Sequence, residues 1–302
     1  MMFPAKKIFI FGVMSLVYNN YNDTLADPVT FKQLAVKDAL FLYYKCPQVD
    51  KQLQLFSHYN EIMFTLEGGR ILRHGEKSWT LTKHSCILTR KTAYLQELPE
   101  ATEWKVLAFY FQDSFFRDVL KEYRQYLPLK SLPVPTADML MEIHTNETTR
   151  AFFYSILPYF THKLPAPEGL LELKFKELLF NIFLDPLNKN VLAYANNLLN
   201  TSKTPIWQVV EKNYMFNLTV EQFAQMANRS VSVFKKEFHQ YYHTTPGKWL
   251  VQKRLELAKS LLEADKKNIG EVAFSSGFEN LSHFSRVFKE KYGVAPTKYK
   301  GT

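Results

Sequence analysis

Hydrophobic and polar positions alternate in short segments from about Leu40 to Phe111. Alternation with a period of two is typical of strands that are buried on one face. Turn sequences such as Glu67-Gly68-Gly69 and His74-Gly75-Glu76 separate the segments. Several short strands at close spacing favour a small β-sandwich or barrel. The predicted strands are Leu53–Phe64, Arg70–His74, Ser78–Leu81, Ser85–Thr89, Ala93–Glu97 and Lys105–Phe111.

The hydrophobic period lengthens at Gln112 to that of helices with one apolar face. Helices are predicted at Gln112–Tyr126, Asp138–Phe160, Pro167–Phe183 and Leu187–Leu199. The third of these is apolar on more than one face, so it needs cover on more than one side. That cover is either the core of the same domain or the equivalent surface of a second copy in a dimer.

The last quarter of the chain repeats one hydrophobic pattern at an offset of fifty residues. A repeat at a fixed period defines a structural unit. Each copy is predicted to form two short helices around a turn, which is a helix-turn-helix. Two such units in one chain suggest a protein that reads duplex DNA. The matched pairs include Phe234 with Phe284, Phe238 with Phe288, Tyr242 with Tyr292, Pro246 with Pro296 and Ser232 with Ser282.

The first unit is predicted at 218–240. Thr219 is a suitable N-cap with Gln222 as its capping-box partner, and Ser230 caps a second helix after the turn. Phe234 and Phe238 lie four residues apart and face the core. The other faces carry short polar and cationic side chains, as a recognition helix requires. The candidates for DNA contact are Ser232, Lys235, Lys236 and His239.

The second unit is predicted at 269–292, where Gly277 tolerates positive φ at the end of one helix and Asn280 caps the next. Its candidates for DNA contact are Leu281, Ser282, His283, Ser285, Arg286 and Lys289. A linker helix predicted at 248–264 would be roughly 25 Å long. It can set the two recognition helices about one DNA turn apart, roughly 34 Å.

Three segments of this region carry a family resemblance. They are Ala273-Phe274-Ser275-Ser276-Gly277-Phe278, then Phe284-Ser285-Arg286-Val287-Phe288-Lys289, then Tyr292-Gly293-Val294-Ala295-Pro296-Thr297-Lys298-Tyr299-Lys300. The stretch from about Ile206 to Lys300 resembles the DNA-binding domain of the AraC/XylS family of bacterial transcription regulators. The sequence departs from the family at His243-Thr244, where a glycine often occurs, and at Lys300, where arginine is common.

The resemblance implies base-reading positions and partners. In the first unit the base-reading positions fall on Ser232, Lys235 and Lys236. In the second unit they fall on Leu281, Ser282, Ser285 and Arg286. The implied partners are double-stranded promoter DNA, RNA polymerase and a second copy of the chain in a homodimer.

Charge is concentrated in the same region. The chain has a net charge of +9, and residues 208–302 hold 15 Lys/Arg against 9 Asp/Glu. A basic C-terminal third fits a nucleic-acid module. The polar stretch Asn200–Pro205 suits a linker, because its final proline can begin a helix. We therefore predict an α+β chain, with a domain at 1–200 that combines a β-sandwich or barrel with helices, a linker at 201–204 and a DNA-binding domain at 205–302.

The order of strands and then helices before Asn200 resembles the cupin-like sensing and dimerisation domain of many AraC-family proteins. That resemblance implies a small-molecule effector or a regulatory protein at this domain. The candidate ligand residues are His58, Glu61, Trp79 and Tyr94. A metal site needs clustered ligands, whereas His58, His74 and His84 are isolated, so we predict neither metal nor cofactor.

Two features bear on the compartment. Cys46 and Cys86 fit neither zinc spacing nor a disulfide framework, which favours a reducing, cytoplasmic setting. Lys6-Lys7 and the apolar run to Tyr18 resemble a short signal core without a clear cleavage site. We interpret that run as a spurious extension or a buried segment, with Met14 as an alternative start to Met1. The run is too short to span a bilayer, and no membrane span is predicted.

The leading prediction is a sequence-specific transcription factor, an activator controlled through its first domain, and not an enzyme. One alternative is an activator whose first domain binds a regulatory protein instead of a metabolite. Another is a cupin metalloenzyme with a DNA-binding appendage, which bound iron or zinc would reveal. A cysteine-based DNA-repair protein ranks last, because neither cysteine lies in a cationic setting.

Overall fold

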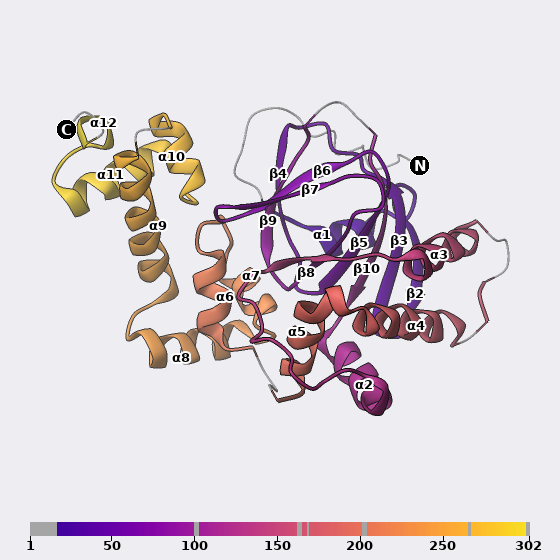
Figure 1. The fold of residues 1–302 in the computed structure, drawn as a ribbon. Coiled ribbons are helices and arrows are strands. Elements are labelled where there is room, and N and C mark those ends of the chain that lie inside the picture. Colours follow the sequence, from indigo (N-terminus) through magenta and orange to yellow (C-terminus); the bar gives the residue numbers. More distant parts are fainter. Residues whose placement is uncertain are drawn as a thin grey trace, which may run out of the picture.

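A computed structural model describes residues 17–99, 103–161, 165–167, 169–200, 204–264 and 267–299 of the 302-residue chain. The apolar run up to residue 16, which includes Met14, lies outside these ranges, as do residues 201–203 of the predicted linker and Lys300. A domain rich in β-strands is followed by an all-helical domain, which confirms the predicted α+β class (Figure 1). The described part of the chain contains no helix that is long and apolar enough to cross a membrane.

Two sheets form the first domain. Their strand orders are β1-β4-β9-β6-β7 and β11-β8-β5-β10-β3-β2. Strand β1 runs parallel to β4, and the other pairs are antiparallel. The strands are β1 Val17–Asn19, β2 Lys32–Val36, β3 Ala39–Lys45, β4 Gln52–Phe56, β5 Asn60–Glu67, β6 Arg70–His74, β7 Lys77–Leu81, β8 Cys86–Thr89, β9 Ala93–Glu97, β10 Lys105–Phe111 and β11 Leu140–Ile143.

The six-stranded sheet is buried on both faces. Successive residues of a strand point to opposite faces. In β10, Val106, Ala108 and Tyr110 belong to the core between the sheets. Leu107, Phe109 and Phe111 point to the other face and belong to the core beneath the helices. Burial on both faces explains why β10 is a continuous apolar run. The covering helices are α2 Asp113–Tyr123, α3 Glu147–Ile156, α4 Leu170–Leu184 and α5 Lys189–Asn200 (Figure 1).

Three predictions for this domain were wrong. The segment Leu53–Phe64 is two strands, β4 and β5, and not one. Strands β1 and β2 precede the range in which strands were predicted. The predicted helix Asp138–Phe160 begins as strand β11, which pairs with β8. Helix α3 begins only after Asn146, whose side chain caps it by accepting the Thr149 backbone N–H at 3.0 Å.

The helical domain is built from two similar halves that share one helix. We call α7 with α8 the first head, and α10 with α11 the second head. Helix α9 runs from one head to the other (Figure 1). It gives Trp249 and Leu250 to the core of the first head, and Leu255, Ala258 and Leu262 to the separate core of the second. The helices are α6 Ile206–Asn213, α7 Val220–Met226, α8 Val231–Tyr242, α9 Pro246–Glu263, α10 Ile269–Ser275, α11 Leu281–Tyr292 and α12 Pro296–Tyr299.

Candidate nucleic-acid interface

Local side-chain contacts fix the ends of the helices in both heads. The predicted capping box is present: Thr219 N–H donates to Gln222 Oε1 at 2.8 Å, and Gln222 N–H donates to Thr219 Oγ1 at 3.3 Å. In the second head, Asn280 Oδ1 caps α11 by accepting two backbone N–H groups. Gly277 adopts φ +86°, as predicted. These contacts satisfy backbone donors that a helix end leaves unpaired, so α7 and the recognition helix α11 have defined starts. The recognition helix α8 is capped by Ser230, whose side chain accepts the Val233 backbone N–H at 3.4 Å.

Helix α8 is anchored by Phe234 and Phe238, which are fully buried. At about 100° per residue, Lys236 lies opposite the mean direction of the two rings. Ser232 lies within about 40° of Lys236, so it also points away from the core. Lys235 projects at about a right angle to that direction, and His239 is also exposed. The helix therefore presents a hydroxyl and a cation outward, with a second cation at its side.

Helix α11 has the same architecture with different outward chemistry. Phe284 and Phe288 are fully buried, and Ser282 and Arg286 occupy the outward positions of Ser232 and Lys236. Arg286 Nη1 donates to Glu290 Oε1 at 3.0 Å, one turn further along the exposed face. The central cation of the second head is therefore paired with a carboxylate.

The ten sequence candidates for DNA contact all lie on α8 or α11, and none is buried. Ser285 is half-buried, and the other nine side chains are exposed: Ser232, Lys235, Lys236, His239, Leu281, Ser282, His283, Arg286 and Lys289. Sequence reasoning missed Val233 and Glu290, which share the outward faces with these candidates. The spacing from the buried phenylalanines could have found both.

The helical domain is bound directly to the sandwich. Asn213, at the end of α6, is fully buried, and its Oδ1 accepts hydrogen bonds from Ala93 N–H and Thr92 Oγ1, both at 2.8 Å. Its amide donates to Val209 O at 2.8 Å, so each of its polar groups is paired. Three sandwich residues, Val17, Phe56 and Ala93, belong to the same apolar core as α6. Thus α6 joins the two domains.

A polar cluster lies inside the sandwich at the candidate ligand residue Glu61. This side chain is fully buried, and its donors are neutral: Asn20 Nδ2 at 3.4 Å, Tyr94 OH at 3.4 Å and Thr89 Oγ1 at 3.5 Å. Burial raises the pKa of Glu61 to about 7, although these hydrogen bonds oppose the rise. The structure thus brings together two of the four ligand candidates, Glu61 and Tyr94.

Among the described residues, neither of the other two ligand candidates, His58 and Trp79, forms a hydrogen bond with Glu61. His58 is half-buried, and the rings of Tyr21 and Tyr59 pack against it. Trp79 lies on β7 opposite Leu72 of β6. Within the described ranges, no hydrogen bond or ring contact joins Trp79 to the Glu61 cluster.

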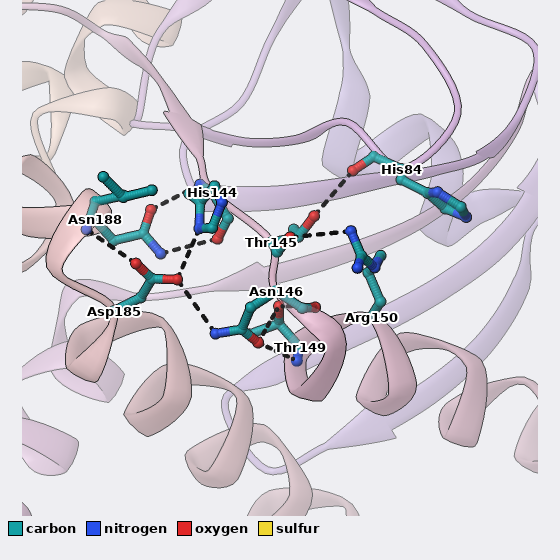
Figure 2. A network of polar contacts seen from close by, with 9 residues as sticks. His84, His144, Thr145, Asn146, Thr149, Arg150, Asp185 and Asn188 are labelled. Atoms are coloured by element: carbon teal, nitrogen blue, oxygen red, sulfur yellow. Dashed lines mark hydrogen bonds and ion pairs between the residues drawn. The ribbon is translucent and has the colours of Figure 1, made fainter.

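Histidines and carboxylates elsewhere serve structural contacts. Figure 2 shows the joint between the start of α3 and the corner between α4 and α5. There Asp185 Oδ2 accepts from the Asn146 amide at 3.3 Å and lies 2.8 Å from His144 Nδ1. Burial would raise the pKa of Asp185, but the hydrogen bonds from His144 and Leu187 outweigh it and lower that pKa. The described residues contain no group of three His, Cys, Asp or Glu that could hold a metal ion.

The two cysteines are free thiols inside the sandwich. Cys86 is buried and Cys46 is partly exposed. Burial raises the pKa of both thiols, and the Gln48 backbone and Arg70 oppose this only partly at Cys46. A thiol whose pKa is raised carries little thiolate at neutral pH and is a weak nucleophile. This chemistry disfavours an alkyl-acceptor role for either cysteine.

Comparisons with known proteins match both halves of the chain. Residues 60–194 match the ExsA N-terminal regulatory domain, and residues 223–302 match a helix-turn-helix domain. The virulence regulon transcriptional activator VirF of Yersinia enterocolitica is 25% identical over 136 residues, which are 45% of this chain and 50% of VirF. The transcriptional regulator ExsA of Pseudomonas aeruginosa is 24% identical over 132 residues, 44% of this chain and 48% of ExsA.

Among solved structures, ToxT from Vibrio cholerae is 16% identical, with a TM-score of 0.42, and the match covers 88% of this chain and 98% of ToxT. The chain spans about half the length of the curated relatives it matches. The two domain matches confirm the resemblance found in the sequence. The chain carries an AraC-type helix-turn-helix domain behind an ExsA-type regulatory domain, and its homologues are AraC-family transcriptional regulators.

Proposed function

We propose, from the premise of an AraC-type helix-turn-helix domain behind an ExsA-type regulatory domain, that this chain is a sequence-specific transcriptional activator. Its two heads bind two boxes of one promoter site, the first box by α8 and the second by α11. The supporting observation is the pair of recognition helices, each with two buried phenylalanines behind an exposed serine and cation. A cationic face releases counterions from DNA phosphates, so binding should weaken steeply with salt.

Within each box, the outward side chains have different roles. Lys236 and Arg286 face away from their cores, so we assign base contacts to them, because a lysine or arginine can donate to guanine O6 and N7. Lys235 projects sideways from α8, and we assign it a phosphate contact, together with His239 and Lys289. Phosphate contacts position the protein on the duplex, whereas base contacts specify the sequence.

The first domain, residues 1–200 in our division, controls DNA binding through α6. Two short segments connect the Glu61 cluster to α6. Ala93 donates to Asn213, and the next residue, Tyr94, bonds Glu61. Val17 belongs to the apolar core that also contains residues of α6. Three residues later, the Asn20 amide donates to the carboxylate of Glu61. A small effector or a regulatory protein that disturbs the cluster would therefore act on the position of the DNA-binding domain.

A double-mutant cycle tests this route of control. Tyr94→Phe removes only the hydroxyl that bonds Glu61 and Asn20. Asn213→Ala removes the bonds to Thr92 and Ala93, together with the one to Val209 in its own helix. If the two sites are coupled, their effects on DNA affinity are non-additive by more than about 0.5 kcal/mol. Trp79→Phe is the control, because among the described residues Trp79 forms no hydrogen bond with Glu61 or Asn213, and its effect should add to that of Asn213→Ala. Additive effects in both cycles would contradict control through α6.

Helix α4 supports a homodimer. Its inner face is core, as Phe175, Leu178 and Leu179 are fully buried. Leu173 on the same helix is 60% exposed, and Leu187 just beyond its end is 70% exposed. Exposed leucines around a helix that also has a buried face fit a surface that a second copy covers. In the proposed function, the dimer acts in the cytoplasm and contacts RNA polymerase at the promoter.

Selection from random duplex DNA by the full-length protein, at near-physiological salt, tests the proposed function. We expect enrichment of a bipartite site with two boxes about one helical turn apart. Arg286→Ala should relax the preference at one position of the second box only. Salt-sensitive binding to every sequence, with no enriched site, would contradict a sequence-specific regulator and leave only a basic DNA-adhering domain.

A further inference from the structure

An apolar side chain interrupts the polar outward face of α8. Val233 is 42% exposed, and it lies on the first turn of the helix between Ser232 and the buried Phe234. At about 100° per residue, it lies roughly 60° from the outward direction that Lys236 defines. The side chain thus points toward the surface that the proposed function places against DNA.

Neither packing nor helix stability accounts for this valine. The preceding valine, Val231, is half-buried and packs against the core of the first head, whereas Val233 is not part of that core. A β-branched residue loses side-chain freedom in a helix, so an exposed valine favours the helix less than lysine, glutamine or alanine would. An exposed position that gains nothing from valine in the free protein suggests a role in the complex.

The second head offers a parallel. Leu281 is 44% exposed, and it is the first residue of α11. Each recognition helix therefore presents one apolar side chain from its first turn, beside an exposed serine. Residues near the start of a recognition helix are those that reach the base edges in the major groove. The residue at the repeat position of Val233 is His283, so the two heads would read different bases there.

The major groove offers one distinctive apolar group to such a side chain, the 5-methyl group of thymine. We propose that Val233 contacts the 5-methyl group of a thymine in the first box and thereby specifies thymine at that position. This inference rests on the proposed function, because it requires α8 to lie in the major groove. Val233 and Lys236 are three residues apart and hence neighbours on the helix surface, so the thymine lies next to the base that Lys236 contacts.

Deoxyuridine provides the test, because it differs from thymidine only by the missing methyl group. Each thymine of the selected first box is replaced in turn by uracil, and the affinity of the full-length protein is measured. We expect about a fourfold loss at one position, which corresponds to burial of one methyl-sized group at about 0.8 kcal/mol. Val233→Ser should bind the thymine site about fourfold more weakly and show no difference between thymine and uracil there.

Two controls separate this contact from general damage. Val233→Ile keeps an apolar tip and should keep the thymine preference. Uracil replacement in the second box should affect Val233→Ser and the native protein equally. The proposal is overturned if uracil is tolerated throughout the first box, or if Val233→Ser still loses affinity at the same position. Failure of the native protein to select any site would instead overturn the proposed function, and this inference with it.

Discussion

The two heads are built on one plan but hold their central cation differently. In both, two buried phenylalanines stand behind a serine and a cation on the outward face. Lys236 of the first head is followed one turn later by Gln240, and among the described residues it forms no ion pair. Arg286 of the second head is followed by Glu290, which pairs with it at 3.0 Å. The difference is one of charge on a shared scaffold.

This difference implies a division of labour between the heads. Lys236 is a flexible point charge that is free to meet a phosphate or a base. Arg286 is a planar fork, and the carboxylate of Glu290 holds it before DNA arrives. That carboxylate also opposes phosphate, so it lowers affinity for any DNA. We therefore expect the first head to contribute more of the general affinity and the second head more of the discrimination between sequences.

The largest predicted effect tests whether the heads are separate units. Phe288→Ala removes a fully buried ring from the core of the second head, which should cost about 3–5 kcal/mol. Because the first head has its own core, selection should retain the first box and lose the second. Phe238→Ala should do the reverse. Loss of both boxes in both variants would show that the heads fold as one unit.

The second prediction concerns the pH dependence of stability that Glu61 causes in the sandwich. This effect should not change the difference between the two heads. The pKa of Glu61 rises from 4.5 to about 7 on burial, so folding favours its protonated form. Its contribution to stability is complete below about pH 4.5 and is lost as pH rises to about 7, by up to about 3 kcal/mol. Urea unfolding of the native protein and Glu61→Gln measures this. The stability difference between them should shift by that amount across this range, and a constant difference would contradict it.

The outward cations give the next largest effect. Arg286→Ala should cost about 1–3 kcal/mol on the selected site and should relax specificity at one position of the second box. Lys236→Ala, the matched change in the first head, should also relax specificity at one position of the first box, but it should weaken binding to every sequence as well, because an unpaired positive charge is lost. Quantitative binding to the selected site and its single-base variants would measure both. Equal weakening of Arg286→Ala on every sequence would exclude base reading by this residue.

Substitution of Glu290, or of Gln240 at the matching position of α8, should have the smallest effect on DNA affinity. Glu290→Gln frees Arg286 and removes a negative charge, so affinity for all DNA should rise, by less than about 1 kcal/mol. Gln240→Glu in the first head should lower affinity by a similar amount. The measurement is DNA affinity as a function of salt, because high salt should screen both effects. Unchanged DNA affinity in both variants would show that Glu290 does not cause the difference between the heads.

Sequence patterns predicted the helical domain better than the sandwich, for a physical reason. The signals for α7, α8 and α11 are local: a capping box at Thr219, an N-cap at Asn280, and phenylalanines four residues apart. Strands β1 and β11 lie at sheet edges, where pairing with β4 and β8 decides the conformation. That pairing partner is distant in the sequence, so a local pattern cannot reveal it.

The same limit applies to the sites. The outward candidates on α8 and α11 follow from helical spacing, which the sequence displays. Val233 and Glu290 were missed because an apolar residue suggests core and an acid suggests solvent. The hydrogen bonds from Asn20 to Glu61 and from Ala93 to Asn213 join residues 41 and 120 apart. Such contacts depend on the tertiary fold, so the link between the two domains could not be predicted.

The central claim is that two heads, held by α9, read one face of the duplex together. The most direct test inserts five or ten base pairs between the two boxes of the selected site and measures the affinity of the full-length protein. Five base pairs move the second box to the opposite face, and ten move it about one turn further along, roughly 34 Å. We predict that both insertions abolish the contribution of the second box. Unchanged affinity with either insertion would contradict two heads set by a rigid linker helix.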